Sequence, residues 1–464
     1  MVISVSTALS QIAQERIKYT LWMLLYPFGV QIRFVSREPF YANRRSDVFD
    51  VGPECEGIGW VTEAISEVMP VDGAIGREYK LPDAPASLPW VGPASDLGPS
   101  VIHEAFVFLS LAIHGSSRDI HGRISWRTSP LSTRFDPKTP YLEIIRHHMA
   151  GRLGLSVRTS CWRHPYVEPT HDIDYGRKWR LGIVYRNVVE RFLLGRDMQG
   201  RVRAEALWSM GRDLLLGRGD PYRNAPSFFA HEAGERGLSS TFFFKAGTHG
   251  PKDVRFRLRA QSLRKIMDRD HRIALHPSYH GSNHVARMRD ELRNLAGAVK
   301  TNHSKGLVHD YVRTHYLRWS RATEQTLIAS GVIFDASLGY PDQVGFLAGS
   351  TYPTLRFDLA ENRAIPIWRI PMVLMDSALF TRMGVRGEDE AMRHTNGILD
   401  RVQQYGGFVT MLWHELILDE DDYPRWKQHY LSTLDHIALI NEGSQRMRYL
   451  EELCSIGSMC PVSS

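Results

Sequence analysis

Two histidines stand four residues apart in the segment RIALHPSYH at positions 272–280, namely His276 and His280. Residues 272–275 favour a short strand, and Pro277 stands where a helix can begin. Imidazoles at positions i and i+4 of a helix lie on one face, at a spacing that can hold a single metal ion. The pair is a weak signal by itself, because 20 histidines in 464 residues give about one such pair by chance.

A third ligand is available in the segment THDID at 170–174. Side chains alternate along a strand, so Asp172 and Asp174 point to the same side. One carboxylate can then bind the ion while the other accepts a proton from an activated water as general base. Two histidines and one carboxylate leave an open position on the ion, which a catalytic site requires.

A further pair of polar residues ends two apolar runs near the C-terminus. His414 follows residues 409–413, and a histidine suits the role of proton donor near neutral pH. Asp376 follows residues 372–375 and could hydrogen-bond to His414, holding its orientation and its positive charge. Two structural alternatives remain open: Asp376 could instead cap a turn, and His414 could be a buried core histidine.

The elements that must position these residues alternate from about residue 165 onward. Repeated βα units predict a mostly parallel sheet or a barrel, in which active groups gather at the carboxyl ends of the strands. Six polar residues fall at or just past such an end, namely Asp172, Asp174, His276, Asp335, Asp376 and His414. The predicted strands include 168–173, 239–244, 272–275, 332–335, 365–375 and 407–413, and the predicted helices 181–194, 201–216, 256–268, 285–299, 323–330 and 388–404.

Length and composition predict a two-domain globular protein. Residues 1–160 carry no catalytic cluster and are expected to form an accessory domain, with residues 161–464 as the catalytic domain. The net charge is +6, but 57 basic residues are nearly matched by 51 acidic ones and are spread along the chain. This pattern does not indicate nucleic-acid binding.

The cysteines and the apolar runs indicate in which cellular compartment the protein is expected. The four cysteines match no zinc motif or disulfide framework. Cys454 and Cys460 could bridge, but free thiols in a reducing compartment are favoured. The apolar run at 19–30 is too short to span a bilayer and contains a proline and a glycine, so we interpret it as a core helix followed by a strand. Since no signal peptide is evident, a cytoplasmic location is expected.

These motifs together carry a resemblance to a known family. The segments THDID at 170–174, STFFF at 240–244, HPSYH at 276–280 and LWH at 412–414 resemble the polysaccharide deacetylase superfamily. This is the NodB-homology fold, or carbohydrate esterase family four, and the chain is most similar to its bacterial branch with an N-terminal domain. The segment DIHGR at 119–123 resembles the accessory domain of that branch.

The resemblance implies an α/β fold, a distorted (β/α) barrel with an N-terminal α+β accessory domain. It also implies removal of N-acetyl groups with a divalent metal, usually zinc. Asp172 would be the general base and His414 the general acid, supported by Asp376. The metal ligands would be Asp174, His276 and His280. The expected substrate-binding residues are Arg313, His315, Asp335 and Trp413, with Asp335 equally suited to cap the loop after it.

One position departs from the family pattern. In GFLAG at 345–349 relatives usually carry an arginine where this chain has Leu347. That arginine orients and balances the catalytic carboxylate. Arg313 or Arg369 could take over its role, and otherwise the loss would signal altered or weakened chemistry.

Several other functions compete with that of a metal-dependent hydrolase. The carboxylates of THDID could be the DxD motif of a glycosyltransferase, but this interpretation leaves HPSYH unexplained. Two histidines and a carboxylate also form the metal-binding triad of non-haem iron oxygenases, but that triad is expected on β-hairpins and not on strands that alternate with helices. A zincin protease would keep a glutamate after His276. A catalytically impaired carbohydrate-binding or interaction module, and a hydrolase of a non-sugar C–N amide, stay open. The favoured prediction is a metal-dependent hydrolase, with zinc as the expected metal. It would remove the acetyl group from an amino sugar in a glycan or in a nucleotide- or lipid-linked precursor.

Overall fold

The computed structural model describes most of the chain. The described residues are 2–6, 11–29, 32–37, 48–51, 99–152 without 116 and 134, 164–178, 220–247, 260–299, 307–444 without 421 and 422, and 446–457, together with residues 155, 162, 208, 211, 212, 215, 252, 253, 258 and 460. The predicted helices at 181–194 and 201–216 fall almost entirely outside them, as do Cys55 and Cys161.

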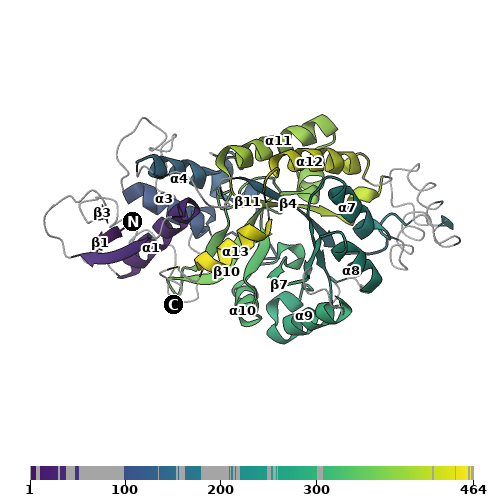
Figure 1. The fold of residues 1–464 in the computed structure, drawn as a ribbon, viewed down its shortest axis with the longest axis horizontal. Helices are drawn as coiled ribbons and strands as arrows, with labels where there is room; N and C mark the ends of the chain where they lie inside the picture. Colours follow the sequence, from purple (N-terminus) through teal and green to yellow (C-terminus); the bar gives the residue numbers. More distant parts are fainter. Residues whose placement is uncertain are drawn as a thin grey trace.

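A closed barrel of parallel strands forms the centre of the molecule (Figure 1). Its order is β11-β4-β5-β6-β7-β8-β10, and β10 also pairs in parallel with β11, which closes the barrel. A further strand, β9 (Thr354–Asp358), pairs antiparallel with β10. The predicted (β/α) barrel is therefore confirmed. The barrel strands are β4 (Tyr166–Ile173), β5 (Thr241–Phe244), β6 (Arg272–Leu275), β7 (Leu307–Val312), β8 (Phe334–Leu338), β10 (Arg363–Met375) and β11 (Phe408–His414).

Helices surround the barrel, and the β5 sequence shows why both faces of its strands are buried. Phe242 and Phe244 pack into the cluster shared with the outer helices, whereas Phe243 packs on the other face against Tyr311. Burying each phenylalanine stabilises the fold by roughly 1.5–3 kcal/mol, so apolar contacts on both faces hold this short strand in place. The outer helices are α7 (Ala225–Gly234), α8 (Ala260–Met267), α9 (Val285–Val299), α10 (Arg321–Ala329), α11 (Glu388–Tyr405), α12 (Trp426–Ile440) and α13 (Arg446–Gly457).

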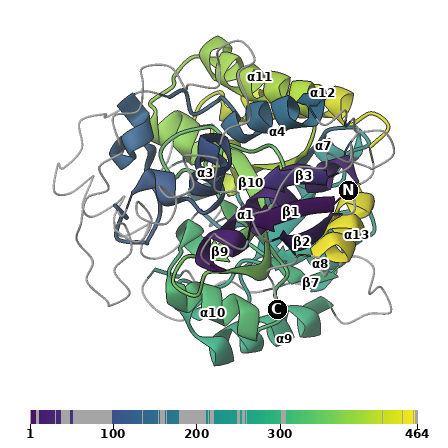
Figure 2. The same cartoon turned by 90° about the vertical axis from the view of Figure 1, so that its left-hand side faces the viewer.

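The N-terminal elements lie at one end of the barrel (Figures 1 and 2). They are the helices α1 (Gln11–Leu25), α3 (Pro99–Leu109) and α4 (Tyr141–Arg152) and a parallel three-stranded sheet in the order β2-β1-β3, with β1 at Val2–Ser6, β2 at Arg33–Arg37 and β3 at Val48–Val51. Tyr19 donates a hydrogen bond of 2.7 Å to the carbonyl of Leu355, and Trp22 packs on Trp368. One hydrophobic cluster thus joins these helices to β9 and β10, and the division into two domains stays a prediction.

Two smaller expectations can be compared with the described residues. Cys454 is a free thiol, so it does not bridge to Cys460. Within the described ranges, none of the helices combines the length and the apolar character needed to cross a membrane.

Candidate catalytic and metal site

Polar side chains from four barrel strands meet at the carboxyl edge. Asp172 is the seventh residue of β4, and Asp174 follows that strand directly. His276 follows β6, and His315 comes three residues after β7. His414 is the last residue of β11 and pairs in register with Asp172. Parallel strands bring their carboxyl ends to one rim, which explains why residues so distant in the chain converge.

Three of these residues form a group that could hold a metal ion. Asp174, His276 and His315 are all buried, and each offers one ligand atom within 4.8 Å of the others. Asp174 Oδ1 lies 3.3 Å from His276 Nε2 and 3.7 Å from His315 Nε2. This oxygen is buried without a hydrogen bond of good geometry. Two imidazoles and one carboxylate are a ligand set that zinc accepts, so the residues fit a divalent ion.

Outer hydrogen bonds orient both imidazoles toward Asp174. His276 Nδ1 lies 2.6 Å from the carbonyl oxygen of Arg313, and His315 Nδ1 lies 3.0 Å from Asp253 Oδ1. Each Nδ1 therefore carries the proton, and each Nε2 keeps its lone pair for an ion. Burial lowers the pKa of His315 even though the carboxylates of Asp174 and Asp253 act in the opposite direction. A neutral imidazole is the form that binds a metal.

His280 does not join this group. The chain after His276 forms an irregular turn and a short 3₁₀ segment, Gly281–Asn283, instead of the predicted helix. The two histidines therefore do not share a helix face, and His280 is exposed, with its ring against Tyr279 at 5.2 Å. The structure groups His315, which the sequence indicated as a substrate-binding residue, with Asp174 and His276 instead.

Arg313 supports the carboxylate of Asp172. Its side chain is fully buried and donates to Asp172 Oδ1 at 3.1 Å and to Thr170 Oγ1 at 2.8 Å. Arg369 donates instead to the carbonyl of Leu109 at 2.7 Å. Leu347 is buried in the hydrophobic cluster that joins the N-terminal helices to the barrel. Of the two arginines suggested as replacements at Leu347, Arg313 is the one that contacts the candidate base.

His414 is paired with Asp376 from the end of β10. Its Nδ1 lies 2.7 Å from Asp376 Oδ1, and its backbone N–H donates to Asp376 Oδ2 at 2.7 Å. Burial disfavours the charged imidazole, but the carboxylates of Asp376, Asp172 and Asp174 outweigh this cost and raise the pKa of His414 to about 10. His414 is therefore an imidazolium at neutral pH, able to donate a proton.

Comparison with known proteins finds solved structures at low sequence identity. No family model and no curated protein matches the chain. Five chains of solved structures are similar to it, three of them as follows. The first is a family 4 carbohydrate esterase from Streptomyces lividans in complex with acetate, with 11% identity, coverage of 60% of this chain and 88% of that chain, and a TM-score of 0.27. The second, from Mycobacterium smegmatis, is described as a polysaccharide deacetylase (14% identity, 59% and 85% coverage, TM-score 0.35).

The third is described as a polysaccharide deacetylase involved in O-antigen biosynthesis, from Bordetella bronchiseptica (13% identity, 62% and 89% coverage, TM-score 0.26). The closed barrel of parallel strands decides the fold class. The chain has a (β/α) barrel fold. Since all three TM-scores are below 0.5, the roles of individual residues rest on the contacts within this chain.

Two predicted substrate-binding residues of this barrel point elsewhere. Trp413 is fully buried and packs on Tyr430, in the layer between the barrel and its helices. Strand alternation explains this, because Trp413 and His414 face opposite sides of β11. Asp335 is buried within β8 and accepts the backbone N–H of Ser337 at 2.9 Å, so it caps the chain locally. Burial raises the pKa of Asp335.

The segment DIHGR docks beside the ligand-bearing loop. The ring of His121 stacks on Tyr316 at 4.8 Å, and the backbone N–H of Trp319 donates to the carbonyl of His121. Gly122 has φ +80°, and a Cβ atom there would meet the Trp319 carbonyl oxygen at 1.8 Å, so this position requires glycine. The N-terminal part of the chain thus contacts the residues that follow His315.

Two residues of the site were not predicted from the sequence. Asp253 orients His315, and no motif marked it. Lys245 directly follows β5, and its Nζ lies 3.0 Å from both Asp174 Oδ1 and His315 Nε2. Its place at a strand end was an available signal, since the other site residues share it.

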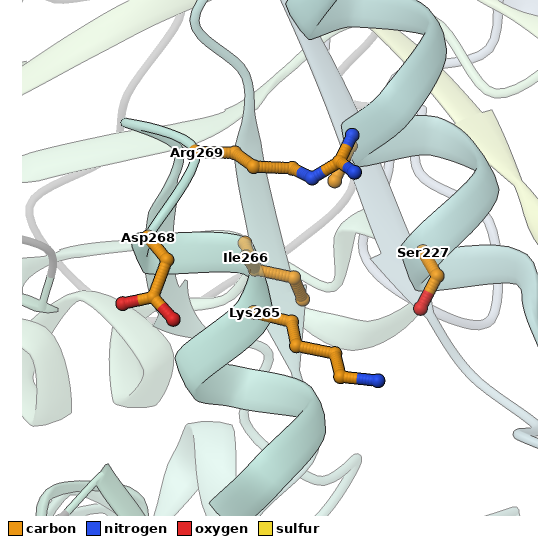
Figure 3. Close-up of a pocket in the computed structure, with 6 residues that line it drawn as sticks. Ser227, Lys265, Ile266, Asp268 and Arg269 are labelled. Carbon is orange, nitrogen blue, oxygen red and sulfur yellow. The ribbon is translucent and has the colours of Figure 1, made fainter.

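A separate cavity of about 410 Å³ lies between α7 and α8 (Figure 3). It is lined by Ser227, Ala230, Lys265, Ile266, Asp268 and Arg269. None of the clustered residues described above lines it, so it is distinct from the candidate site.

Proposed function

We propose that this protein is a metal-dependent N-deacetylase that hydrolyses the acetamide of an amino sugar in a glycan or glycan precursor. The observation that carries the proposal is the convergence of five residues at one rim of the barrel. Asp174, His276 and His315 offer metal ligands, Asp172 offers a base, and His414 offers an acid. Catalysis of amide hydrolysis needs these three functions within reach of one carbonyl group.

The ligand group would hold a divalent ion, and zinc suits its mixed nitrogen and oxygen donors best. When bound, such an ion would polarise the acetyl carbonyl and lower the pKa of a water molecule. The backbone carbonyl of Arg313 binds Nδ1 of His276, and the carboxylate of Asp253 binds Nδ1 of His315. These two hydrogen bonds fix the direction in which each Nε2 points.

Asp172 is placed to accept the proton of the attacking water. Arg313 holds one of its oxygens, Oδ1, while Oδ2 lies 3.8 Å from His276 Nε2, next to the ligand group. The carboxylate is thus fixed in orientation, with its second oxygen directed toward the reacting centre. A carboxylate held in this way acts as a general base without first having to be ordered.

His414 is placed to protonate the leaving nitrogen. Its Nδ1 is engaged by Asp376, and its side chain is 14% exposed, so substrate can reach the ring. Since its pKa is raised to about 10, it holds a proton throughout the neutral range. The released amine would take this proton as the C–N bond breaks.

Acetate release provides the direct test. Purified protein with added zinc would be incubated with a panel of N-acetylated sugars, including nucleotide-linked ones, and with a cyclic amide. Release of acetate from a sugar, abolished by Asp172→Asn, supports the proposal. Hydrolysis of the cyclic amide alone would instead identify a hydrolase of non-sugar amides.

A catalytically impaired relative that binds carbohydrate is the second candidate. Lys245 favours it, because a cationic side chain contacts two of the three metal-binding atoms. Protein that binds a sugar but contains no stoichiometric metal and releases no acetate would support this alternative.

A further inference from the structure

Lys245 places an ammonium group inside the candidate metal site. Its side chain is 1% exposed, and it projects from the chain directly after β5. Nζ lies 3.0 Å from Asp174 Oδ1 and 3.0 Å from His315 Nε2, while these two atoms are 3.7 Å apart. The lysine nitrogen and the two ligand atoms therefore form a compact triangle.

The lysine uses the same electron pairs that a metal ion would use. His315 donates its Nδ1 proton to Asp253, so its Nε2 can only accept, and Lys245 is the donor that faces it. Asp174 supplies the negative charge that a buried ammonium requires. Lys245 thus contacts two atoms of the ligand group at once.

We propose that Lys245 and a divalent ion compete for Asp174 and His315, so that the ion is held only when the lysine side chain leaves these atoms. This inference rests on the metal site of the proposed function. Metal–ligand distances are about 2.0–2.2 Å, so a lysine that stayed beside both ligand atoms would face the ion as a like charge at short range. The lysine therefore weakens the binding of the ion.

Asp253 offers the displaced lysine a second partner. It is buried, accepts from His315 Nδ1, and accepts the backbone N–H of Tyr279 at 2.9 Å. A movement of the side chain from Asp174 to Asp253, the carboxylate that holds the other nitrogen of His315, would keep the ammonium paired.

The test compares zinc affinity in the full-length wild type and two variants, measured by competition with a chromophoric chelator. Lys245→Met removes the ammonium and keeps a side chain of similar length. Lys252→Met is the matched control, since Lys252 is exposed and lies over the ring of Tyr279 at 4.1 Å. We expect Lys245→Met to bind zinc about tenfold more tightly or better, and Lys252→Met to stay within about threefold of the wild type.

The absorption bands of bound Co²⁺ give a second readout that does not depend on activity. Lys245→Met that binds zinc no more tightly than the wild type, or that holds no zinc, would overturn the inference. Should Lys245→Met fail to fold, as judged by circular dichroism and thermal unfolding, Lys245→Gln replaces it with the same criteria. A variant that binds zinc tightly but releases acetate from no sugar would refute the proposed function and leave this inference standing.

Discussion

His414 and Asp172 are direct neighbours across two parallel strands, β11 and β4. Each is held by a different outer residue, because Asp376 from β10 binds His414 and Arg313 from beyond β7 binds Asp172. The candidate acid and the candidate base thus lie side by side but are oriented independently. This arrangement allows each to be tested by its own substitution.

Substitution of Asp172 by asparagine should abolish turnover without removing the metal. The asparagine side chain has nearly the same size as that of aspartate but cannot accept the proton of a water molecule. A general base contributes roughly 10²–10⁴-fold, so kcat should fall by about that factor. Acetate release measures the loss, and zinc content with circular dichroism serves as the control. Normal turnover in this variant would refute the assignment of the base.

Substitutions of His315 and His280 distinguish two ligand sets. The structure groups His315 with Asp174 and His276, whereas the family resemblance implied His280 as the third ligand. His315→Ala should lose stoichiometric zinc, because it removes one of three donors. His280→Ala should keep its zinc, since His280 is exposed and outside the group. Metal analysis of the two dialysed variants checks this. The reverse result would restore His280 as the third ligand.

Asp376→Asn should lower the pKa of His414, which a histidine NMR titration can follow. In the folded protein this pKa is about 10, above the ordinary histidine value of 6.5. The pair therefore stabilises the fold fully below pH ~6.5, and this contribution is lost as pH rises through about 10.

The free energy of unfolding of Asp376→Asn should accordingly fall below that of the wild type at pH 7, and the difference should shrink toward pH 10 and above. The alkaline limb of kcat should also move to lower pH, because His414 loses its proton earlier. An unchanged titration of His414 would show that Asp376 does not set its charge.

Arg313 and Arg369 form a matched pair, since both are buried arginines on the barrel. Arg313→Met should lower kcat by tenfold or more, about 1.4 kcal/mol in the barrier, because Asp172 loses its partner. Arg369→Met should destabilise the fold but leave kcat of the folded fraction nearly unchanged, since Arg369 donates to Leu109 and Thr354. Chemical denaturation and steady-state kinetics separate the two effects. Equal losses of kcat would contradict the role given to Arg313.

Much of the architecture could be predicted from local patterns. Residues 285–299 and 388–404 were predicted as helices and appear as Val285–Val299 and Glu388–Tyr405, because their apolar residues follow the helical period over many turns. The apolar runs at 272–275 and 407–413 likewise correspond to β6 and β11. Alternation along β4 correctly placed Asp172 and Asp174 on one side of the strand, toward the rim.

The sequence by itself determined the alternation of strands and helices, the pair of carboxylates on β4 and the histidines that end two strands, because strand and helix periodicity are local properties. Closure of the parallel sheet into a barrel is a tertiary feature. Only the tertiary structure decided which third imidazole joins Asp174 and His276. The spacing of HPSYH suggested His280, but the chain turns after Pro277 and takes His280 to the surface. His315 and Lys245 reach the group because parallel strands place their carboxyl ends side by side. The spacing of residues along the chain does not reveal which strands are neighbours in the sheet.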